Sequence, residues 1–113
     1  MVVHDDQYFL DHAAAALRDA GLDVVCFPGS MAALRGLRAA DTIDLLITRV
    51  RFPEGTPHGL SLAMMAKYQR PGIKVLFSAR PDMEKYTEAL GELVQYSADV
   101  SELVDTAIKL LRK

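Results

Sequence analysis

The sequence has one cysteine, no tryptophan and no strong excess of either charge. The single cysteine, Cys26, cannot form an internal disulfide, which fits a reducing cytoplasm. The net charge of -2 shows no basic excess, so nucleic acid is not an expected partner. No signal peptide is recognisable, and no apolar run approaches the ~20 residues of a membrane-spanning helix. These absences predict a cytoplasmic protein with neither a nucleic-acid nor a membrane partner.

The composition is that of an ordinary globular protein, with 50% hydrophobic and 25% charged residues among 113. Neither repeats nor Pro/Gly-rich linkers divide the chain, so we expect one domain over residues 1–113. The first expected strand begins almost at Met1, which favours a natural chain start. Whether the domain stands alone or is part of a larger protein stays open.

Apolar runs and helical periodicity alternate along the sequence. Strands are expected at residues 2–3, 22–27, 43–48, 73–78 and 92–96. Helices are expected between them, the first ending at Gly21 and the fourth covering residues 82–90. We expect helix caps at Ser30 and, with Glu102, at Asp99. The expected buried helical positions are Leu10, Ala13, Ala14 and Leu17, then Leu62, Met65 and Ala66, then Val104, Ala107, Ile108 and Leu111.

The third expected strand, residues 43–48, is apolar almost throughout rather than alternating, which indicates burial on both faces, as in parallel sheets. Five strand–helix units predict an α/β, flavodoxin-like fold: a five-stranded parallel sheet of order 2-1-3-4-5 with five helices on both faces. Ligands of such sheets bind outside the carboxyl ends of the strands. The residues at those ends are His4, Asp5, Asp6, Arg49, Ser78, Ala79, Tyr96 and Ser97.

Five segments in order resemble a response-regulator receiver domain, the phosphoacceptor module of two-component signalling. They are VVHDD, LLITRVRFP, PHGLSLA, VLFSAR and VQYSADVSEL, which together cover essentially the whole chain. Pro53 stands in the usual place of the family, and residues 54–56 resemble a slightly lengthened loop. The resemblance implies a receiver-like domain that is not an enzyme in its own right.

Departures from the family pattern fall on the reactive positions. In receiver domains, an Asp after the third strand accepts a phosphoryl group from a histidine kinase. Two acids after the first strand help to hold Mg²⁺, and a Ser/Thr and a Lys bind the phosphoryl oxygens. Here Arg49 stands at the acceptor position, Tyr96 at the lysine, Ser97 at the following proline and His4 at the first acid, while Asp5, Asp6, Ser78 and Ala79 remain.

The resemblance therefore implies a degenerate phosphoacceptor pocket, without catalysis or a cofactor, in which Mg²⁺ binding is weak or lost. An arginine is cationic at any workable pH and cannot form an acyl phosphate. We expect Arg49 to pair with Asp5 or Asp6, and Tyr96 to lie along the guanidinium or to cap it. Asp6 is equally a candidate cap of the first helix.

The resemblance also implies an interaction face, comprising Met83, Tyr86, Leu90, Leu93 and Gln95. Its partner would be a protein, namely a histidine kinase, an output domain or another receiver, and a homodimer is an option. The expected role is a phosphorylation-independent interaction module in two-component (phosphorelay) signal transduction.

Two alternatives stay open. The first is a receiver with residual Mg²⁺ or phosphoryl-anion sensing through Asp5, Asp6 and Ser78. The second is a small-ligand-binding module that uses the same crevice. A transition-metal site at His4 is disfavoured, because neither His12 nor His58 is expected to converge with it.

Overall fold

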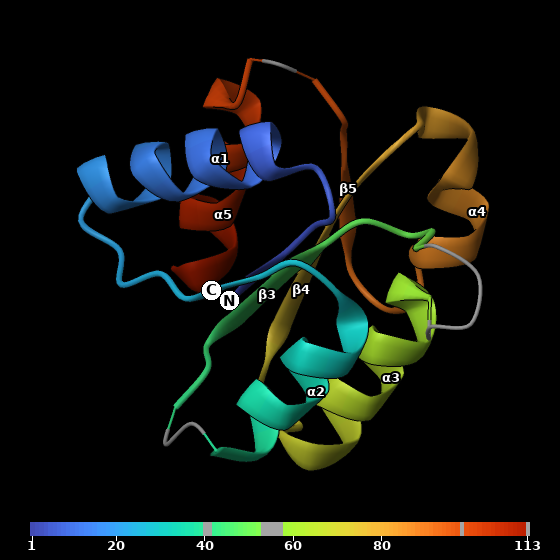
Figure 1. Ribbon diagram of the computed structural model, residues 1–113. Coiled ribbons are helices and arrows are strands. Elements are labelled where there is room, and N and C mark those ends of the chain that lie inside the picture. Colours follow the sequence, from blue (N-terminus) through green and yellow to red (C-terminus); the bar gives the residue numbers. More distant parts are fainter. Residues whose placement is uncertain (40–41, 53–57, 98, 113) are drawn as a thin grey trace.

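The computed structural model describes residues 1–39, 42–52, 58–97 and 99–112 (Figure 1). It confirms the predicted fold, a parallel sheet of five strands in the order β2-β1-β3-β4-β5. The strands are β1 (Val2–Val3), β2 (Cys26–Phe27), β3 (Leu45–Thr48), β4 (Lys74–Ala79) and β5 (Glu92–Gln95). The helices are α1 (Gln7–Asp19), α2 (Ser30–Ala39), α3 (Gly59–Gln69), the 3₁₀ turn η1 (Pro81–Met83), α4 (Glu84–Thr87) and α5 (Ser101–Leu111).

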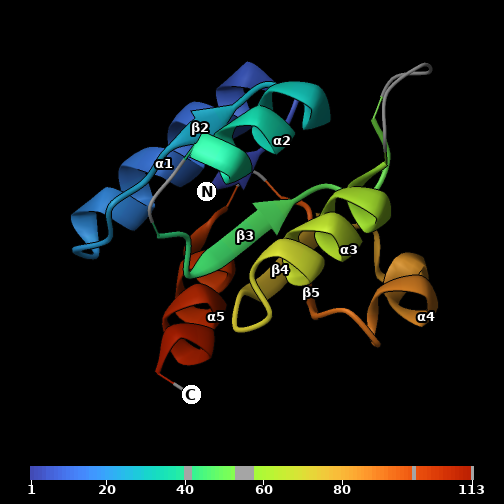
Figure 2. The same ribbon diagram turned by 90° about the horizontal axis from the view of Figure 1, so that it is seen from below.

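The sheet lies between two layers of helices, α1 and α5 on one face and α2 and α3 on the other (Figures 1 and 2). Successive side chains of a strand point to opposite faces. In β4, Val75 and Phe77 accordingly pack in the cluster that contains the buried side chains of α2 and α3. Leu76 between them packs with those of α1 and α5. This double burial explains why the middle of β4 is an uninterrupted apolar run.

The strand register brings the candidate site residues to one edge. Val3 pairs with Thr48, so His4 and Arg49 follow the ends of adjacent strands. Ala79 pairs with Gln95, and the backbone N–H of Tyr96 donates to the Ala79 carbonyl at 3.0 Å. Because all five strands run parallel, their carboxyl ends meet at this edge.

The second strand is much shorter than predicted, since only Cys26–Phe27 of residues 22–27 pair with the sheet. β2 lies at the edge of the sheet, and its one neighbour, β1, is itself two residues long. Val25 just before β2 is 48% exposed. An apolar run predicts a strand from its composition, but the length of an edge strand is set by its partner.

Both ends of α1 follow local chemistry that the sequence indicates. The Asp6 carboxylate caps the first turn by accepting the backbone N–H groups of Tyr8 and Phe9. At the other end Gly21 has a φ of 91°, a left-handed conformation that favours glycine. The N–H of Leu22 then donates to the Leu17 carbonyl, which ends the helix in a Schellman motif.

Two predicted details of α2 and α3 are wrong. Ser30 is the first helical residue rather than the cap, and its fully buried hydroxyl has no hydrogen-bond partner among the described residues. In α3, Ala63 takes the buried position next to Leu62, while Met65 is 40% exposed. The small Ala63 lets the helix approach the sheet closely, whereas periodicity alone favoured the larger Met65.

The last two helices also differ from their predictions. The segment expected to be one helix over residues 82–90 is the 3₁₀ turn η1 followed by the single-turn helix α4. Residue 100 takes the cap position of α5, while the Asp99 carboxylate accepts the N–H and hydroxyl of Ser101 at 3.0 and 2.8 Å. The buried face of α5 is Leu103, Ala107 and Leu110, so the helix is rotated about its axis from the predicted face.

The loop predicted at residues 53–57, which includes Pro53, connects β3 to α3 and lies outside the described residues. At the first residue of α3, Gly59 packs directly on the backbone of residue 49. Its N–H donates to the Val50 carbonyl at 2.7 Å. A Cβ built on Gly59 would lie 1.8 Å from the Arg49 carbonyl oxygen. Glycine is therefore required here by close backbone approach.

We expect Gly59→Ala to destabilise the fold by about 1–3 kcal/mol, because its methyl group overlaps backbone atoms, which yield less easily than the end of a flexible side chain. Chemical denaturation measures the free energy of unfolding. Gly72→Ala is the matched control, since a Cβ there meets nothing within 4 Å. Equal unfolding free energies for the two variants would contradict this account of Gly59.

Candidate functional site

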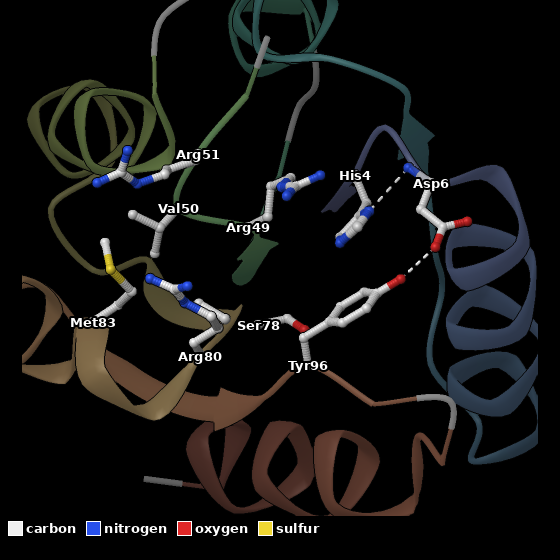
Figure 3. A pocket seen from close by; sticks show the side chains of 10 residues that line it. His4, Asp6, Arg49, Val50, Arg51, Ser78, Arg80, Met83 and Tyr96 are labelled. Carbon is white, nitrogen blue, oxygen red and sulfur yellow. Dashed lines mark hydrogen bonds between the residues drawn. The ribbon is translucent and has the colours of Figure 1, made fainter.

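The carboxyl edge of the sheet holds a cavity of about 520 Å³ between β1, β3, β4 and β5 (Figure 3). Of the eight residues predicted for the site, six line it: His4, Asp6, Arg49, Ser78, Ala79 and Tyr96. Asp5 contacts the Arg49 guanidinium next to it. Ser97 lies apart from the cavity, where its hydroxyl accepts the Asp99 N–H at 3.2 Å.

The Arg49 guanidinium forms an ion pair with Asp5, through Nη1 and Oδ1. Of the two expected carboxylate partners, Asp5 is therefore the one that the structure joins to it. The two side chains are 35% and 33% exposed, so water screens their attraction. A pair this exposed contributes roughly 1 kcal/mol or less to stability, and its main effect is to place a cation at the end of β3.

His4 is buried and neutral. Only 2% of its surface is exposed, and its Nδ1 accepts the Asp6 backbone N–H at 3.0 Å, so the ring proton resides on Nε2. Burial and the nearby Arg49 guanidinium lower the pKa of His4 to about 4, against the opposing effect of Asp5 and Asp6. Nδ1 lies 3.8 Å from the Asp5 carboxylate, but a neutral ring forms no ion pair with it.

The Tyr96 ring stacks on His4 rather than on Arg49, so the predicted contact with the guanidinium is wrong. The His4 and Tyr96 ring centroids are 5.1 Å apart, with an interplanar angle of 15°. The phenol donates a hydrogen bond to the Asp6 Oδ2. This bond stabilises the charged carboxylate, and it is the main cause that lowers the pKa of Asp6 and raises that of Tyr96.

Phe9 completes this aromatic group and was not predicted as a site residue. Its ring centroid lies 4.5 Å from that of His4 and 5.0 Å from that of Tyr96, with tilted planes in both pairs. Phe9 comes from the first turn of α1 and is buried, although it is not on the apolar stripe predicted for that helix. Its contact with His4 depends on the direction in which α1 leaves β1, which helical periodicity does not reveal.

Both Asp6 oxygens are already in use. Oδ1 accepts the two capping N–H groups of α1, and Oδ2 accepts the Tyr96 hydroxyl. Asp5 is paired with Arg49. Over the described ranges, no group of three or more His, Cys, Asp or Glu side chains is arranged to hold a metal ion. The two acids that resemble the receiver metal pair thus hold protein groups instead.

Two further arginines line the cavity, Arg51 after β3 and Arg80 after β4. Sequence reasoning missed both, although each stands two residues beyond a predicted site residue, in TRVR and SAR. Arg80 pairs with Asp82 at 3.1 Å, and both side chains are largely exposed. Among the described residues that line the cavity, three are arginines, with Arg49, and one has a carboxylate, Asp6.

Of the five residues predicted for the interaction face, some are buried and others are exposed. Met83 is buried at 8% exposure and lines the cavity, so it is not part of a surface. Leu90 and Leu93 are partly buried and pack against the core. Tyr86 on α4 is 54% exposed, and Gln95 at the end of β5 is also exposed. A single helical turn leaves too little periodicity to separate buried from exposed positions in advance.

Neither a protein-family model nor a curated protein sequence matches the chain. Solved structures do match. The response regulator TrrA from Thermotoga maritima, in complex with Mg²⁺ and BeF, is 21% identical over 96% of this chain and 95% of its own, with a TM-score of 0.85. A receiver protein from Sinorhizobium medicae is 19% identical over 98% and 91%, with a TM-score of 0.86.

NtrX from Brucella abortus, in complex with ATP, is 21% identical over 98% of this chain and 26% of its own, with a TM-score of 0.85. These values establish the fold: the chain has the fold of response-regulator receiver domains. Within the part of the chain that the structure describes, no helix is long and apolar enough to span a membrane.

We expect acidification to destabilise the protein through His4. The ordinary pKa of ~6.5 in the unfolded chain exceeds the folded value of about 4, so the unfolded state binds more protons between these pH values. The stabilisation is therefore complete above pH ~6.5 and falls as the pH drops towards 4, by about 2 kcal/mol between pH 7 and pH 5. Denaturant unfolding at each pH measures this loss.

The variant His4→Asn should lose this pH dependence, since an amide oxygen can still accept the Asp6 N–H but does not titrate. His12→Gln replaces an exposed imidazole on α1 and should behave as the parent protein does. The Asp6 and Asp99 carboxylates, whose pKa values are lowered, contribute stability that is lost only as the pH falls below their ordinary pKa of 3.8. If the unfolding free energy of His4→Asn depended on pH as that of the parent protein does, His4 would not be the source of the pH dependence.

Proposed function

We propose that this chain is a receiver-like domain of two-component signal transduction that works without phosphotransfer, as a cytoplasmic protein–protein interaction module rather than an enzyme. The observation that carries the proposal is the Arg49–Asp5 ion pair at the end of β3. In the receiver fold that position is where the acceptor carboxylate would stand. A guanidinium is no nucleophile towards phosphorus, and it neutralises an acid that would otherwise help to bind Mg²⁺.

Tyr96 supports the same proposal. The resemblance places the phosphoryl-binding lysine at this position, but the phenol has no positive charge and its hydroxyl is committed to Asp6. The stack on His4 and Phe9 holds the ring in place. Residual Mg²⁺ binding through Asp5, Asp6 and Ser78 is less well supported, because both acids already have protein partners.

The proposed partner is a protein, such as a histidine kinase, an output domain or another receiver. The NtrX chain is about four times the length matched here, which is consistent with a receiver-like unit that works beside other domains. The exposed Tyr86 on α4 and Gln95 on β5 form the docking face, since tyrosine gives much contact area at a low entropic cost. A second copy of this chain is another possible occupant of that face.

Titration with Mg²⁺ and then beryllofluoride, followed by two-dimensional amide NMR, tests the loss of phosphotransfer. We expect no Mg²⁺-dependent shifts at Asp5, Asp6 or Ser78 in the parent chain, because no acceptor carboxylate is present at position 49. Arg49→Asp should gain Mg²⁺-dependent shifts around the cavity. Parent-chain shifts that require Mg²⁺, begin at Ser78 and spread to Tyr86 would overturn the proposal.

The docking face is tested by Tyr86→Arg, compared with Tyr68→Arg as a matched control. Tyr86 is 54% exposed on α4, whereas Tyr68 is 89% exposed on α3. Self-association is measured by sedimentation, and binding to purified kinase and receiver domains by calorimetry. We expect Tyr86→Arg to weaken binding at least about tenfold, as for an interface hot spot, and Tyr68→Arg to leave it unchanged. Equal effects of the two variants would place the interface elsewhere.

A further inference from the structure

We propose that the cavity at the carboxyl edge binds a small organic molecule with a dianionic oxyanion group, without a covalent bond and without a metal ion. The first argument is charge. Arg49, Arg51 and Arg80 line the cavity, and Asp6 is the one carboxylate among the described lining residues. Asp5 and Asp82 pair with Arg49 and Arg80, so Arg51 is the lining cation without a carboxylate partner in the described ranges. Its guanidinium favours an anion in the cavity over a cation.

Arg51 and Arg80 have donors to offer a ligand. Within the described ranges, the Arg51 guanidinium has neither a hydrogen bond nor an ion pair to another residue. Arg80 is held by an exposed pair with Asp82, which a ligand can displace at little cost. Planar guanidinium groups bind carboxylate and phosphate oxygens through paired N–H donors. Because Arg51 and Arg80 follow adjacent strands and each has a positive charge, together they favour a dianion over a monoanion.

The second and independent argument is the Ser78 hydroxyl. Ser78 is the fifth residue of β4, only 2% of it is exposed, and it faces the cavity (Figure 3). No hydrogen bond joins its hydroxyl to another residue within the described part of the chain. Its oxygen faces the cavity instead of a protein group, so a ligand oxygen placed there could accept the hydrogen bond of the hydroxyl.

The shape and the remaining lining indicate an organic body rather than a bare ion. The cavity of about 520 Å³ lies in the range of small-molecule sites, roughly 300–1,000 Å³. In Figure 3, Val50 and Met83 lie on the same side as Arg51 and Arg80, with His4, Asp6 and Tyr96 opposite. The anionic group would contact Ser78 and the arginines, while Val50 and Met83 contact an apolar part.

This inference goes beyond the proposed function and does not rest on it, since ligand binding and partner binding use different residues. A failure of ligand binding leaves the docking test at Tyr86 unaffected. A failure of the docking test likewise leaves the cavity unaffected. If both hold, the ligand would be an input that takes the place of phosphorylation.

The test is an NMR titration of the full chain in EDTA with phenyl phosphate, phthalate, inorganic phosphate and the neutral benzyl alcohol. We expect saturable shifts around Ser78 with at least one of the two aromatic dianions, and tighter binding of phenyl phosphate than of inorganic phosphate. Comparison of phenyl phosphate with phthalate distinguishes a phosphate ester from a dicarboxylate. Affinity should fall as NaCl is added.

Arg51→Gln and Arg80→Gln should each weaken binding of the preferred dianion by at least about tenfold, the loss of one charge-assisted hydrogen bond. Ser78→Ala should also weaken it, while the fold is retained because the hydroxyl bonds to no described residue. Arg35→Gln on α2, an exposed arginine away from the cavity, is the control. No saturable binding of either aromatic dianion, equally tight benzyl alcohol binding, or equal loss in Arg35→Gln would overturn the proposal.

Discussion

The burial of β3 and β4 on both faces is the constraint on which the rest of the structure depends. Each face of these strands is covered by helices, so their middle residues are apolar. Polar side chains can face water only where a strand ends. The chemistry of the molecule is therefore concentrated at the carboxyl edge, where four strands place His4, Arg49, Ser78 and Tyr96 around one cavity.

At that edge the charges are arranged in the opposite sense to the receiver domains that the sequence resembles. The resemblance places a carboxylate after the third strand and a cation after the fifth, whereas this chain has a guanidinium after β3 and a neutral phenol after β5. The surrounding groups fit this arrangement. Asp5 balances the arginine, Asp6 accepts the phenol, and His4 stays neutral between them.

Much of this was predictable from the sequence, because parallel strands bring their ends together. The sheet order and a carboxylate partner for Arg49 follow from this geometry. Contacts that depend on exact helix placement were not predictable. Phe9 reaches His4 only because of the angle of α1, the rotation of α5 buries Leu103 and Leu110, and the 3₁₀ turn η1 buries Met83.

The contacts among these groups have a consequence for substitutions at this edge. A single change of Arg49 to an acid would place a third carboxylate beside Asp5 and Asp6 and remove the cation that Asp5 now uses. Tyr96 would bring no compensating charge unless it changed too, and it would then abandon Asp6 and the aromatic stack. Each of these changes is unfavourable unless the others accompany it, so the groups at this edge form one coupled unit.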